Sequence, residues 1–159
     1  MNTGNLTAYL NDHLAGSVGA LELLGHMRND APEDYFHEFC NSLYLEIEAD
    51  QKVLEKLIVQ LGGKEGLMKR TAAWLLEKAA WTGAKLGGSE KNEMGRLQAL
   101  EGLELGIVGK RSLWVALTSI EHLAVALENV GFAHLIVRAE EQIHQVETER
   151  LKCISAVFS

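Results

Sequence analysis

The chain has 159 residues, with 15 lysines and arginines against 22 aspartates and glutamates, a net charge of −7 and a single proline. This acidic balance argues against a nucleic-acid partner, and a hydrophobic content of 47% argues against disorder. The length fits one domain over residues 1–159, and no apolar run reaches the ~18 residues of a membrane span. With two isolated cysteines and no signal-peptide pattern at the start, we expect a cytoplasmic protein that binds no membrane.

Helical spacing of apolar residues runs through the chain and predicts an all-α protein. The expected helices cover about residues 5–28, 33–61, 64–86, 91–122 and 131–157. Pro32 marks the start of the second helix, whereas glycine pairs at 62–63 and 87–88 end the second and the third. The helix at 64–86 is long enough to carry the chain back along a bundle. This order predicts a four-helix bundle with a long helical crossover between the second and third bundle helices.

Several polar side chains fall inside the apolar stripes of these helices. They are His13 on the first helix, Asp50 on the second, Glu104 with Glu101 and Arg111 on the third bundle helix, and Glu147 with Arg150 on the last. A buried charge without a partner is unfavourable, so each of these groups must form an ion pair, bind a metal ion or reach water.

Hairpin geometry predicts which of these side chains meet. Residues equally distant from a tight turn lie at the same level on the two helices. A turn near Asp30 therefore brings His13 and Asp50 within about one helical turn of each other. The second hairpin brings Glu104 level with Glu147 in the same way.

The helix layout and the inward carboxylates resemble the ferritin-like di-iron superfamily. The stretch YLNDHLAGSV at 9–18 is also similar to the start of small bacterial ferritin-like proteins. The resemblance implies an iron site built from one Glu on each of two helices and a Glu-x-x-His on each of the other two. The sequence departs from that pattern, because His13 is the inward group of the first helix, and Gln51 and Arg150 stand where the histidines are expected. A complete Glu-x-x-His at Glu141 and His144 is predicted to face solvent.

Two hypotheses for the function follow from this departure. Arginine stays protonated and cannot ligate a metal, and its guanidinium pairs well with carboxylates. In the first hypothesis, Glu101, Arg111 and Arg150 belong to a buried charge network in a ferritin-like protein with an incomplete di-iron site. Such a protein is a non-catalytic structural, stress-related or interaction protein, with no cofactor and no enzymatic activity.

In the second hypothesis the metal site is altered rather than lost. Iron or manganese is then held by His13, Asp50, Glu104 and Glu147, because carboxylates and imidazole are ligands for these metals. The chain would in that case be a metal-dependent oxidoreductase or an iron-binding protein.

Two further features concern packing and partners. Trp74 and Trp81 form one stripe of the 64–86 helix, which also carries a second apolar stripe. The aromatic stripe either packs against the same chain or docks a second copy in a homodimer. Cys40 and Cys153 lie on apolar stripes and are expected to be buried, inert thiols.

Overall fold

The computed structural model describes residues 3–31, 33–62, 93–120, 127 and 129–159. In this part of the chain every regular element is an α-helix. The helices are α1 (Thr3–Asn29), α2 (Asp34–Gln60), α4 (Glu93–Thr118) and α5 (Phe132–Val157). The predicted all-α class is therefore confirmed, with four long helices. The chain divides into two compact units, Met1–Ala99 and Leu100–Ser159, and the boundary lies inside α4.

The helix bounds agree with the sequence pattern except at the end of α4. That helix ends at Thr118, although the pattern predicts a helix to about residue 122. Its last turn tightens, because the amide of Ser119 donates to the carbonyl of Ala116 at 3.1 Å, and the Thr118 hydroxyl donates to the carbonyl of Val115 at 2.7 Å. The predicted crossover helix at 64–86 lies outside the described residues.

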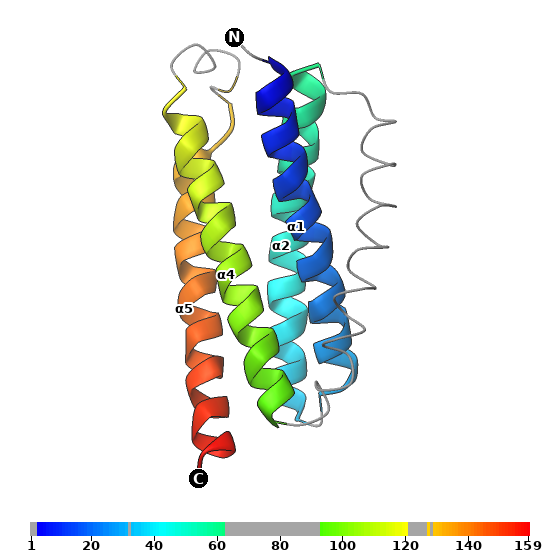
Figure 1. Ribbon diagram of the computed structural model, residues 1–159, viewed down its shortest axis with the longest axis vertical. Helices are drawn as coiled ribbons and strands as arrows, with labels where there is room; N and C mark the ends of the chain where they lie inside the picture. The colour runs from blue at the N-terminus through cyan, green and yellow to red at the C-terminus, as the bar shows by residue number, and fades with distance from the viewer. Residues whose placement is uncertain (1–2, 32, 63–92, 121–126, 128) are drawn as a thin grey trace. The chain divides into compact units, whose positions relative to one another are not determined.

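In the first unit, α1 and α2 form an antiparallel hairpin (Figure 1). The Gln51 amide donates to the Ser17 hydroxyl at 2.9 Å near the middle of the hairpin, and Arg28 donates to the Asn41 side-chain oxygen at 3.0 Å near the turn. Leucines at positions 10, 14 and 24 of α1 are buried, as is the stripe of α2 from Phe36 to Ile58. These are the stripes that the helical spacing predicts.

The C-terminal end of α2 lies where the glycine pair at 62–63 predicts it. The amide of Leu61 donates to the carbonyl of Leu57 at 3.0 Å, and Gly62 follows with a φ of 86°. This left-handed conformation is available to glycine because it has no Cβ. The first glycine of the 62–63 pair therefore acts as the expected stop signal.

In the second unit, α4 and α5 also run antiparallel (Figure 1). The buried apolar side chains of α4 in this unit are Leu100, Leu103, Ile107, Leu113, Trp114 and Leu117, and those of α5 are Leu135, Ala139, Val146 and Cys153. The rings of Trp114 and Phe132 lie 6.2 Å apart near the start of α5. The hairpin thus presents matching apolar stripes, and Gln142 and Glu149 are the polar residues buried among those of α5.

Candidate functional site

The central polar contact of the second unit joins the inward carboxylate of α4 to an arginine of α5. Arg150 Nε lies 3.0 Å from Glu104 Oε2, and the two side chains are only 22% and 26% exposed. Both residues were predicted to lie on inner faces, and the predicted pairing of an arginine with a carboxylate is observed here. The contact is an ion pair without hydrogen-bond geometry, because the buried Arg150 Nε has no hydrogen-bond partner in the described part of the chain. The guanidinium nevertheless places a positive charge beside the carboxylate.

A second inward contact lies farther along the same hairpin, and sequence reasoning missed it. Gln142 of α5 is fully buried, and Lys110 of α4 donates to its Oε1 atom. The position of Gln142 three residues after Ala139 and four before Val146 was the available signal, since both neighbours lie on the buried stripe. An uncharged amide attracts less attention than a carboxylate, although it has the same need for a partner when buried.

Glu149 is a buried acid of α5 that the sequence pattern did not single out. It is 8% exposed, and the Lys152 ammonium donates to its Oε1 atom at 2.6 Å from one turn farther along the helix. Each buried or half-buried acid of this hairpin that is described above therefore has a basic side chain beside it.

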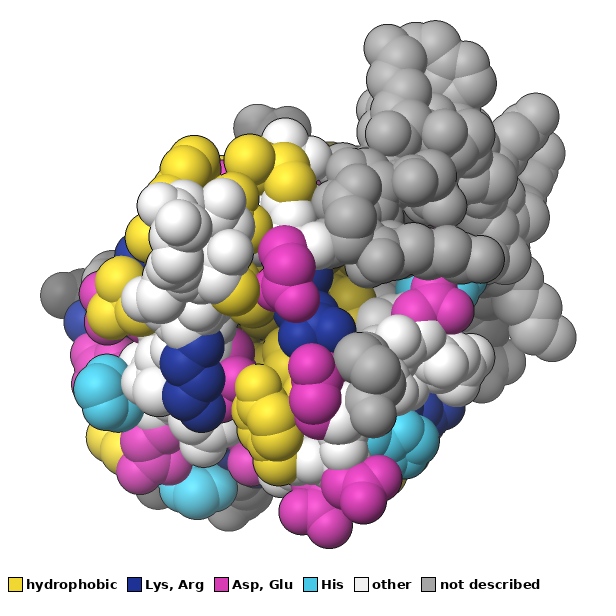
Figure 2. Space-filling view, turned by 90° about the horizontal axis from the view of Figure 1, so that it is seen from below, with side chains coloured by type: hydrophobic (Ala, Val, Ile, Leu, Met, Phe, Trp, Pro, Cys, Tyr) yellow, Lys and Arg dark blue, Asp and Glu magenta, His cyan; other side chains and the backbone are white. Residues whose placement is uncertain are grey.

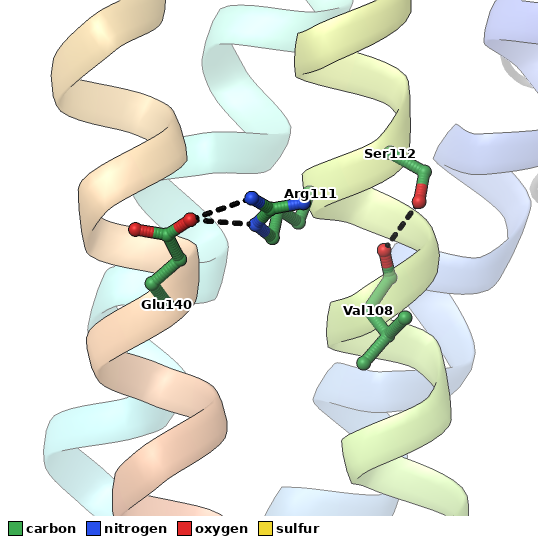
Figure 3. Close-up of polar contacts among 4 residues, drawn as sticks. All are labelled: Val108, Arg111, Ser112 and Glu140. Carbon is green, nitrogen blue, oxygen red and sulfur yellow. Dashed lines mark hydrogen bonds and ion pairs between the residues drawn. The ribbon is translucent and has the colours of Figure 1, made fainter.

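Arg111 lies in a more exposed contact than the one predicted for it. Its Nε donates to Glu140 Oε1 at 2.8 Å, and a second guanidinium nitrogen lies 2.7 Å from the same oxygen (Figure 3). The two side chains are 41% and 49% exposed. Figure 3 also shows that Arg111 points towards α5, whereas Val108 and Ser112 lie on the other side of α4. The pair therefore borders the hairpin on its solvent side.

Glu101 and Glu147 also lie at exposed positions. Glu147 stands one turn before Arg150 on α5, and Arg150 is the residue that contacts Glu104. That Glu147 lies level with Glu104 stays a prediction from the sequence. The Glu-x-x-His residues Glu141 and His144 are both exposed, and this prediction is confirmed.

In the first unit, Asp50 is buried at 1% exposure and His13 is half-buried, with the Tyr9 ring edge-on at 4.7 Å. The two are farther apart in register than predicted. Because Gln51 lies opposite Ser17, Asp50 lies opposite Val18, five residues or about 8 Å from His13 along α1. The cause is the turn, since α2 begins only at Asp34 and the hairpin is centred later than Asp30.

The structure also bears on the predicted metal ligands His13, Asp50, Glu104 and Glu147. Among the residues that the structure describes, no three His, Cys, Asp or Glu side chains are grouped so that they could hold a metal ion. The iron or manganese site thus stays a prediction from sequence. Cys40 and Cys153 are both buried, as expected.

A further basic side chain anchors the start of α4 to the start of α2 within the first unit. Arg96 lies 3.3 Å from Glu33 and stacks over the Phe36 ring at 4.5 Å. Side chains of both charges lie next to one another when the molecule is viewed from the end at which α2 begins (Figure 2). Arg96 thus combines an ion pair with a cation–π contact, and both fix the entry of α4.

Burial of His13 has a consequence for stability at low pH. Desolvation lowers the pKa of His13 below its ordinary value of 6.5, and the nearby Asp12 carboxylate opposes this shift only in part. The unfolded chain then binds a proton that the folded chain resists, so the free energy of unfolding falls as the pH drops below about 6.5. We expect wild type to lose more stability than His13→Gln in urea titrations between about pH 8 and about pH 5.

The exposed His144 supplies the control for this comparison. His144→Gln makes the same substitution at an exposed position, so only His13→Gln removes an imidazole that burial desolvates. Equal losses for wild type and His13→Gln would contradict the desolvation of His13.

These features define an all-α protein with antiparallel helix pairs, in which Arg150 lies beside Glu104 and Lys152 beside Glu149 in the α4–α5 hairpin. None of the described helices combines the length and the apolar character needed to cross a bilayer. No family model, no curated protein and no solved structure matches the chain. The geometry of the chain's own residues therefore carries the functional argument.

Proposed function

We propose that this chain is a ferritin-like bundle protein in which ion pairs stand in place of metal ligands. It acts in the cytoplasm as a non-catalytic structural, stress-related or interaction protein. The observation that carries the proposal is the 3.0 Å contact between Arg150 and Glu104. In the resemblance described above, Arg150 occupies the position of a ligating histidine and Glu104 that of a ligating carboxylate.

The chemistry of this contact supports the absence of a metal requirement. A carboxylate taken out of water needs a positive charge nearby, and either a metal ion or a guanidinium supplies it. Arg150 does so here without an open coordination position, because a protonated guanidinium has no lone pair to offer a metal. The Lys152–Glu149 contact places a positive charge beside a buried acid of α5, the helix that also carries Arg150.

Metal analysis tests the proposal. The protein is produced in medium supplemented with iron and manganese, purified without chelators and analysed by elemental mass spectrometry. We expect far less than one ion per chain in wild type. Stoichiometric iron or manganese would overturn the proposal and favour the altered site of His13, Asp50, Glu104 and Glu147.

A gain-of-ligand variant sharpens this experiment. Arg150→His completes a Glu-x-x-His spacing with Glu147 and removes the competing guanidinium from Glu104. We expect its metal content to rise above that of wild type. The matched control is Arg111→His, which places an imidazole on the outward-bordering pair with Glu140 and is expected to leave the metal content unchanged.

A further inference from the structure

The outer face of α4 is unusually apolar for a solvent-exposed helix surface. Five exposed positions, Glu101, Leu105, Val108, Ser112 and Val115, follow one another at alternating spacings of four and three residues. Leu105 is 74% exposed, Val108 42% and Val115 38%. Alternating spacing of this kind forms one straight seam along a helix and is the pattern by which two helices pack together.

The corresponding outer faces of two other helices are different. The exposed seam of α2 carries Glu38, Lys52 and Lys56, and that of α5 carries His134, Glu141 and His144. Each of these surfaces interrupts its apolar residues with polar groups that keep it solvated. On α4 the single charge of the seam, Glu101, stands at its start. The polar residue after it, Ser112, donates its hydroxyl to the carbonyl of Val108 at 3.0 Å, so the rest of the seam carries no charge that would oppose contact.

The two flanks of the α4 seam differ in a way that indicates what it contacts. One flank carries the small residues Gly102, Gly109 and Ala116, and a Cβ added at either glycine would meet no atom within 4 Å. The described chain therefore does not itself fill the space beside these glycines. The other flank carries Glu104 and Arg111, which have opposite charges and stand seven residues apart.

We propose that this face of α4 binds the same face of a second copy of the chain, with the two helices antiparallel. In this arrangement Leu105 packs against Val108 of the second copy, and Glu104 lies opposite Arg111 of the second copy. The two-fold axis repeats each contact, as an isologous dimer requires. This surface is separate from the Trp74/Trp81 stripe, which lies outside the described residues, and it does not depend on the metal question.

Charge and size select this orientation. In a parallel pair the flank with Glu104 and Arg111 would face the small-residue flank of the second copy, and neither charge would have a partner across the interface. In the antiparallel pair the two charged flanks face each other, so Glu104 lies opposite Arg111 of the second copy and the contact is attractive. Both side chains remain partly exposed in their contacts within the chain, Glu104 at 26% and Arg111 at 41%. On the opposite flank the same register places Gly102 against Gly109 of the second copy, which allows the helices to approach closely.

A charge in the seam tests the dimer directly. Leu105→Glu is expected to convert a wild-type dimer into a monomer in sedimentation velocity, because it buries two carboxylates against apolar side chains. The matched control is Leu45→Glu on the outer face of α2, where the leucine is 57% exposed. We expect that variant to stay dimeric, with unchanged helical circular dichroism in both. A monomeric wild type, or a dimer that survives Leu105→Glu, overturns the proposal.

Cysteine cross-linking tests the orientation. A mixture of Leu105→Cys and Val108→Cys chains is expected to form an intermolecular disulfide on mild oxidation, because these positions face each other in the antiparallel pair. Val115→Cys alone is expected to form none, since its two copies lie about 25 Å apart along the helices in this register. Efficient cross-linking of Val115→Cys would indicate a parallel pair and overturn the antiparallel arrangement.

Discussion

Trp114→Ala is expected to lower the free energy of unfolding by about 3–5 kcal/mol, which is the range for removing a large buried aromatic side chain. Trp114 is 1% exposed and is the largest fully buried side chain in the part of the chain that the structure describes. Its ring lies 6.2 Å from that of Phe132. Its removal leaves a cavity where α4 ends and α5 begins. The surrounding side chains fill this cavity only in part. Urea denaturation followed by circular dichroism measures the loss.

Trp114→Phe separates the packing of this residue from its polar atom. The indole Nε1 is buried and has no hydrogen-bond partner in the part of the chain that the structure describes. Phenylalanine gives up some volume but removes an unpaired donor, so we expect a loss of less than about 2 kcal/mol. A loss as large as that of Trp114→Ala would contradict the unpaired state of Nε1. Phe158→Ala, at a residue 71% exposed, serves as the control and is expected to change stability by less than about 0.5 kcal/mol.

The helices were predictable because apolar residues recur at helical spacing within each segment of the sequence. The stripe from Phe36 to Ile58 and the glycine after Leu61 were sufficient to place α2, and the structure buries that stripe and gives Gly62 a left-handed conformation. The end of α4 was less predictable. There the Thr118 hydroxyl donates to the carbonyl of Val115 and competes with the backbone amides for it. The spacing of apolar residues contains no information about this hydrogen bond.

The polar contacts were predictable only in part, because they depend on register between helices. Counting from the turn placed Glu104 level with Glu147, and the ion pair that Glu104 forms is with Arg150, three residues farther along α5. The same counting misplaced His13 relative to Asp50, since the position of a turn sets the level of every residue beyond it. Arg111 could not be assigned to Glu140 at all, because the helical wheel gives a direction from the axis and not a partner.

Arg150→Met is expected to lower the free energy of unfolding by about 2 kcal/mol, because it leaves Glu104 partly buried without its cation. Methionine retains most of the apolar stem of arginine, so the loss reports on the guanidinium rather than on packing. The matched control is Arg111→Met, whose ion pair is 41% and 49% exposed and is expected to contribute about 0.5 kcal/mol or less.

A double-mutant cycle distinguishes the contact between Glu104 and Arg150 from independent effects of each residue. If the 3.0 Å ion pair determines the loss, Glu104→Gln in the Arg150→Met background should recover part of it, since the unpaired carboxylate is then gone. Equal losses for Arg150→Met and Arg111→Met, with no coupling to Glu104, would show that water rather than the guanidinium balances this carboxylate. Glu104 would then be available to bind a metal ion. The proposal that ion pairs stand in place of metal ligands would be wrong, because it depends on this contact.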